Sequence, residues 1–156
     1  KSILIPHKHQ DPLLGFDEIT GAVQVPVGIG TDDADGLPRP PQLDLKDGMV
    51  IKFGNQEMTV LDTPGHTEGA TCFLIGKHLF SGDTLFPGGP GKTRSPEALQ
   101  QVIDSITKKL LVLPDDTAVY PGHGDDTTIG EAREQYQVFA SKPRDPGLFG
   151  DVAWLV

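Results

Sequence analysis

The chain has 156 residues, of which 37% are hydrophobic, enough for the core of one globular domain. Its formal net charge is -9 and it has no basic run, so nucleic acids and anionic membranes are not expected as partners. No segment reaches the roughly 20 apolar residues that a membrane-spanning helix needs. The single cysteine, Cys72, has no partner for an internal disulfide. These features predict a protein of the reducing cytoplasm.

The first predicted element is a short buried strand, Ile3-Leu4-Ile5, which ends at Pro6. His7 and His9 follow directly. Because residues two apart in extended backbone point to the same side, both imidazoles would face one cavity, and Asp11 could reach it from the next turn. Two imidazoles and a carboxylate suit zinc or iron. The short pattern is weak by itself, since surface histidines also cluster by chance.

The middle of the chain predicts further strands. Residues 22–27 are rich in valine and predict a strand, and residues 28–41 predict a long loop that is either mobile or part of a pocket wall. Two β-hairpins are predicted by pairs of apolar runs around glycine-containing turns: residues 49–53 with 57–61, and residues 71–75 with 78–80.

Two helices are predicted in the second half. Ser95 and Pro96 are typical of a helix start, with serine as N-cap and proline at the first helical position. Apolar residues then recur at helical spacing: Leu99, Val102, Ile103, Ile106 and Leu110. Residues 130–139 predict a final helix. We assign residues 1–140 to one domain and residues 141–156 to a tail without a functional motif.

Three further turns each place a possible metal ligand directly after an apolar run. They are Thr-Pro-Gly-His-Thr-Glu-Gly with His66, Ser-Gly-Asp-Thr with Asp83, and Tyr-Pro-Gly-His-Gly with His123. Glycine and proline let the backbone turn sharply and approach an ion closely. Four of the five histidines lie in such loops, and the fifth, His78, is expected on the surface of a hairpin. The predicted metal ligands are His7, His9, Asp11, His66, Asp83 and His123.

In this order the motifs resemble the metallo-β-lactamase superfamily, in its glyoxalase II-like branch, from about residue 3 to about residue 136. The resemblance implies an α+β fold, an αββα sandwich with two metal ions at the edge of its two sheets. The implied ligands are His7, His9 and His66 for one ion, and Asp11, the residue at position 12 and His123 for the other, with Asp83 bridging both.

Two departures from the family pattern change these expectations. Pro12 stands where the family has a histidine, and proline offers no donor atom, so we expect one firmly bound zinc and a weak or absent second ion. Pro6 stands where threonine is usual. The chain also starts almost on the strand before His7, so we expect an incomplete first sheet. Its open edge beside residues 3–5 would allow a homodimer.

The chemistry implied by the resemblance is metal-assisted hydrolysis of a small ester, thioester or lactone. Zinc lowers the pKa of bound water from roughly 16 to about 7, which makes hydroxide available at neutral pH. Asp11 would orient this water or take its proton, and Asp83 would hold the metal, so both are candidate catalytic residues. Lys92 is a candidate for binding an anionic substrate, although an ordinary solvated lysine is equally compatible with its position.

Two alternatives stay open. The first is a mononuclear iron dioxygenase that acts on a persulfide-type sulfur substrate, using two histidines and one aspartate on a single iron. Losing the second site at Pro12 would not harm that activity. The second is a degenerate metal-binding domain without turnover. Metal identity and oxygen uptake would separate the two enzymes.

Overall fold

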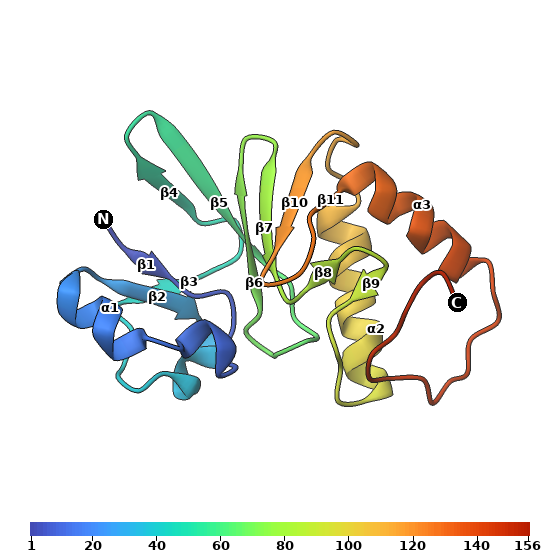
Figure 1. The fold of residues 1–156 in the computed structure, drawn as a ribbon, viewed down its shortest axis with the longest axis horizontal. Helices are drawn as coiled ribbons and strands as arrows, with labels where there is room; N and C mark the ends of the chain where they lie inside the picture. The colour runs from blue at the N-terminus through green and yellow to red at the C-terminus, as the bar shows by residue number, and fades with distance from the viewer.

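The computed structural model describes residues 1–156 and has two β-sheets with helices on their outer sides. Figure 1 shows helix α1 (Phe16–Ala22) beside the small first sheet and helices α2 (Pro96–Ser105) and α3 (Ile129–Ala140) beside the larger second sheet. The α+β class and the αββα arrangement predicted from the sequence are therefore confirmed. None of the helices is both long and apolar enough to cross a membrane.

The first sheet has three parallel strands in the order β1-β2-β3. They are β1 (Ile3–Leu4), β2 (Val27–Gly30) and β3 (Leu43–Leu45). Strand β1 pairs only with β2, so its other edge is open, as the sequence predicted. The homodimer through this edge stays a prediction.

The second sheet has six strands in the order β11-β10-β7-β6-β5-β4. The strands are β4 (Val50–Phe53), β5 (Gln56–Asp62), β6 (Thr71–Ile75), β7 (His78–Gly82), β10 (Ala118–Pro121) and β11 (Thr127–Thr128). Both predicted hairpins are confirmed, because β4 pairs with β5 and β6 pairs with β7 in antiparallel register. A separate short hairpin, β8 (Leu85–Phe86) with β9 (Gly89–Pro90), follows β7.

Both predicted helices are confirmed. The Ser95 hydroxyl accepts a hydrogen bond from the backbone N–H of Ala98 (3.1 Å) and caps α2, which begins at Pro96. A π-helical turn, Ile106–Leu110, continues α2. In α3, the Thr128 hydroxyl caps the first turn by accepting from the N–H of Glu131.

The strand predicted at residues 22–27 is wrong. Ala22 ends helix α1, and β2 begins only at Val27. The alternating valines are typical of a strand, but residues 23–26 form no strand ladder. Pro26 only accepts one hydrogen bond, from the N–H of Ile3 in β1 (2.9 Å), and has no N–H of its own to donate.

The long loop predicted at residues 28–41 is also partly wrong. Residues 28–30 belong to β2, and Thr31–Gly36 forms a 3₁₀ segment. Gly28 is typical of a loop in sequence, but here it lies in a crowded parallel strand. A Cβ added to it would lie 3.0 Å from Leu43 and 3.1 Å from Leu4.

The largest core cluster lies against the second sheet and its helices, and the tail takes part in it. Trp154 is fully buried and packs against the rings of Tyr136 and Phe139. Its backbone N–H donates to the carbonyl of Gly88 (2.8 Å). Cys72 is fully buried as predicted, and burial raises the pKa of its thiol to about 11. The last residues are thus part of the folded domain.

We expect Trp154→Ala to lower the free energy of unfolding by about 3–5 kcal/mol, because it leaves a large cavity in the core. Denaturant unfolding followed by circular dichroism measures this loss, since the variant has no tryptophan fluorescence. Leu155→Ala is the matched control, because Leu155 is 57% exposed and should matter little. Equal stability of both variants would contradict the packing of the tail.

Candidate metal centre

The candidate site gathers five side chains from four loops at the junction of the two sheets (Figure 1). His7 and His9 follow β1 of the first sheet. His66 follows β5, Asp83 follows β7, and His123 follows β10 of the second sheet. Each side chain is thus carried by a short turn at the end of a paired strand, which places all five near one point.

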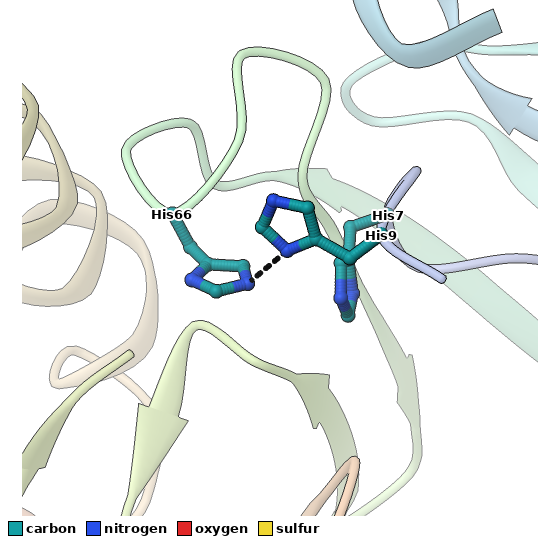
Figure 2. A group of neighbouring side chains, drawn as sticks. All are labelled: His7, His9 and His66. Carbon is teal, nitrogen blue, oxygen red and sulfur yellow. Dashed lines mark hydrogen bonds between the residues drawn. The ribbon is translucent and has the colours of Figure 1, made fainter. Parts of the chain in front are cut away.

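Three imidazoles converge in this site, as Figure 2 shows. The ring centroids of His7, His9 and His66 lie 4.5–5.1 Å apart, with the ring planes nearly perpendicular. Nδ1 of His9 and Nε2 of His66 are 2.8 Å apart. A tetrahedral ion with ligand bonds of about 2 Å would space its ligand atoms by about 3.3 Å. The cluster therefore has the dimensions of a site for one ion.

Neighbouring groups orient two of these rings. Nδ1 of His66 lies 2.8 Å from the carbonyl oxygen of Lys92, which can only accept, so this nitrogen carries the proton and Nε2 presents its lone pair to the site. On the outer side, Nη2 of Arg94 lies 3.3 Å from Nε2 of His9 and can only donate to it. Without an ion, Nδ1 of His9 then donates to Nε2 of His66, so ion binding must displace this proton.

Buried polar atoms without partners point to a cation. His7 is 1% exposed, and neither of its ring nitrogens has a hydrogen-bond partner. Oδ1 of buried Asp83 has none either. Each such atom costs about 1–3 kcal/mol when left unpaired. An ion held between these groups would remove that cost, so the residues present fit a divalent metal.

Asp83 lies at the centre of the predicted set. Its Oδ2 is 3.8 Å from Nε2 of His7, 3.6 Å from Nε2 of His66 and 3.5 Å from Nε2 of His123. Gly122 lets this carboxylate approach the last loop, since an added Cβ would lie 2.5 Å from Oδ1 of Asp83. Asp83 thus contacts both halves of the predicted site.

The residues predicted for a second ion are less compact. His7, Asp11 and Asp83 form a possible ligand group, with Oδ1 of Asp11 3.7 Å from Nε2 of His7. The side chains of Asp11 and His123 are 54% and 65% exposed. Pro12 lies in the 3₁₀ segment Asp11–Leu13 and adds no donor atom. The second group is therefore looser and more hydrated than the three imidazoles.

A cavity of about 350 Å³ opens beside His66, Asp83 and His123. Its wall includes the ring of Phe86, which packs on His123 with centroids 4.8 Å apart. Lys92, the candidate for binding an anionic substrate, lies in this lining, and its Nζ is 3.7 Å from Oδ2 of Asp151. Both side chains of that pair are largely exposed.

Sequence reasoning missed two parts of the site. The tail residues Asp151, Val152 and Ala153 complete the cavity wall, and no motif in the sequence marks them. Asp33 is fully buried next to the histidine loops, but in the sequence it is one of three closely spaced aspartates. His78, predicted on the surface of a hairpin, is exposed and pairs with the hydroxyl of Tyr120.

Burial lowers the pKa of both His7 and His9 below the ordinary 6.5. For His7 the carboxylate of Asp83 opposes this effect, and the nearby His66 adds to it. For His9 the nearby His66 and Arg94 add to it. Both imidazoles are therefore held in the neutral form, which is the form that binds metals.

Comparison with known proteins gives consistent matches. The family model of the metallo-beta-lactamase superfamily matches residues 1–123. A hydroxyacylglutathione hydrolase from Alkalilimnicola ehrlichii is 36% identical over 148 residues, which are 94% of this chain and 54% of the relative. The chain spans about half the length of the curated relatives that it matches.

Two solved structures share the fold. ETHE1 from Myxococcus xanthus superposes with a TM-score of 0.79 at 28% identity, covering 94% of this chain and 65% of its own. TTHA1623, solved in a di-iron-bound form, superposes with a TM-score of 0.69 at 32% identity, covering 83% of this chain and 73% of its own.

We expect the metal-free chain to lose stability as the pH falls through 6.5, the ordinary histidine pKa. Below pH 6.5 the unfolded chain binds protons at His7 and His9 that the folded chain does not bind, which favours unfolding. The loss of stability levels off below the lowered pKa values of the folded chain. Denaturant unfolding in chelator, at about pH 7.5 and about pH 5.5, measures the change. His7→Gln should flatten the dependence and the control His78→Gln should not. Stability that rises toward the lower pH would contradict the assignment.

Proposed function

The chain belongs to the metallo-beta-lactamase superfamily, and we propose that it is a metal-dependent hydrolase of small esters, thioesters or lactones. This membership confirms the resemblance carried by the four loops. The observation that carries the proposal is the convergence of His7, His9 and His66 beside Asp83, where His66 and Asp83 line a cavity of about 350 Å³. A thioester is favoured by the relative named hydroxyacylglutathione hydrolase.

In this proposal His7, His9, His66 and Asp83 hold the metal. Three imidazoles and a carboxylate are a ligand set that suits zinc. When bound, such an ion lowers the pKa of a coordinated water and polarises a carbonyl oxygen. Nε2 of His66 and the unpartnered nitrogens of His7 already face the site, so binding needs little rearrangement of these two rings.

The remaining residues act on the substrate and the proton. The Asp11 carboxylate is the proposed acceptor for the proton of the attacking water, because its Oδ1 lies 3.7 Å from Nε2 of His7 and the group is half exposed. Phe86 and the tail form part of the cavity wall. Lys92 is proposed to attract an anionic part of the substrate at the cavity mouth.

One firmly bound ion and a weaker second one are proposed because Pro12 removes a ligand and because Asp11 and His123 are exposed. The same observation favours the second candidate, a mononuclear iron dioxygenase with a persulfide-type substrate. That chemistry needs only one metal position. Iron in the purified protein and oxygen uptake with persulfides would support it, and zinc with ester cleavage would support the hydrolase.

The test of function joins metal content to turnover. We expect purified chain to contain about one zinc and to cleave a panel of thioesters, oxygen esters and lactones. His66→Ala should abolish metal retention and activity, because a three-imidazole site rarely survives loss of one ligand. His78→Ala is the matched control and should change neither. Cleavage that persists in metal-free His66→Ala would sink the proposal.

Restoring the missing ligand tests the second position. We expect Pro12→His to raise the metal content toward two ions per chain, because it supplies an imidazole beside Asp11. Elemental analysis of the loaded protein measures the ratio. Pro40→His is the matched control. It adds a histidine at an exposed position outside the four loops of the site and should leave the ratio of metal to chain unchanged. An unchanged ratio in Pro12→His would show that residue 12 does not face the site.

A further inference from the structure

Asp33 is a fully buried carboxylate that belongs to neither group of possible metal ligands. It lies in the 3₁₀ segment Thr31–Gly36, directly after strand β2 of the first sheet. Burying a carboxylate is costly unless several donors satisfy it. The identity of those donors indicates what Asp33 does.

The first donor belongs to the loop after β1. The backbone N–H of Lys8 donates to Oδ2 of Asp33 (3.1 Å). Lys8 stands between His7 and His9, so this bond fixes the peptide that joins the two imidazoles. The ammonium group of Lys8 also lies 3.6 Å from Oδ1 of Asp33 and balances its charge.

The other donors belong to the loop between β5 and β6 of the second sheet. The Thr67 hydroxyl donates to Oδ2 of Asp33 (2.6 Å), and the N–H of Gly69 donates to Oδ1 (3.0 Å). Thr67 directly follows His66. Gly69 permits this approach, since an added Cβ would lie 2.5 Å from the backbone nitrogen of Asp33 and 2.8 Å from its Cβ.

One carboxylate therefore joins the residues next to all three imidazoles, across the junction of the two sheets. A backbone bond from the N–H of Thr71 to the carbonyl of Pro6 (2.9 Å) also crosses this junction, but it holds only the His7 side, since Thr71 is a strand residue in β6 and not a neighbour of His66. We propose that Asp33 is a positioning residue that holds the His7–His9 loop against the His66 loop, so that their nitrogens converge before metal binds. The proposal rests on the metal site of the proposed function and not on the substrate.

The test uses cobalt(II), whose visible absorption reports the geometry of its ligands. Asp33→Asn keeps the size of the side chain, but its NH2 group must face either the N–H of Gly69 or the N–H of Lys8, both of which are donors. We expect the metal-free variant to fold by circular dichroism, to bind cobalt about 10- to 100-fold more weakly than the natural chain, and to show an altered spectrum. A chelator competition titration gives the affinity.

Asp35→Asn is the matched control. Asp35 pairs with the same Lys8 ammonium (3.0 Å), but its side chain is 79% exposed. We expect natural cobalt affinity and spectrum for this variant. Thr67→Val and Thr67→Ser provide a second pair, useful where Asp33→Asn fails to fold. Valine removes one donor to Asp33 and should weaken binding, whereas serine keeps the hydroxyl and should restore it.

The outcomes separate this proposal from the proposed function. If Asp33→Asn, or Thr67→Val, binds cobalt with natural affinity and spectrum, Asp33 is only a structural residue and the proposal fails. If the natural chain binds cobalt and the variants lose it, the proposal stands even where the natural chain cleaves no ester or thioester. A natural chain that binds no metal would overturn both.

Discussion

The structure depends on bringing three imidazoles and one carboxylate together in the narrow junction between two β-sheets. A protonated imidazole would be poorly hydrated in this space and would be repelled by a protonated neighbour. Burial and the nearby His66 therefore lower the pKa of His7 and His9. His7 and Asp83 also keep polar atoms unpaired. Burying these imidazoles and unpaired atoms costs folding free energy, so the surrounding fold must hold them in place. Such locally unfavourable groups in a rigid frame are typical of a preorganised binding site.

The rigid support comes from close approaches of glycine. Gly65, before His66, has a φ of 142°, and an added Cβ would collide with Val102 in helix α2. Gly122, before His123, allows the carboxylate of Asp83 to pass within contact distance. Gly65 and Gly122 are therefore packing requirements. Because they have no side chain, the loop of His66 can lie against α2 and the loop of His123 can lie against Asp83.

The C-terminal tail packs into the core and also lines the cavity beside the candidate metal site. Trp154 is locked into the core, and two hydrogen bonds join Gly150 to Thr93, next to the carbonyl that orients His66. The same stretch supplies Asp151 and Val152 to the cavity wall. The loop that orients a proposed ligand and the wall that would contact the substrate are thus stabilised by the same packing.

Local patterns in the sequence determined much of this protein. The two hairpins, the cap at Ser95 and the four loops with His7, His9, His66, Asp83 and His123 depend on turn chemistry and periodicity, which act between near neighbours. The false strand at residues 22–27 shows the limit, because a strand exists only where a partner offers hydrogen bonds. Only the tertiary structure decided the roles of Asp33 and the tail. Asp33 is one of three similar aspartates in the sequence, and contacts 25 to 36 residues apart single it out.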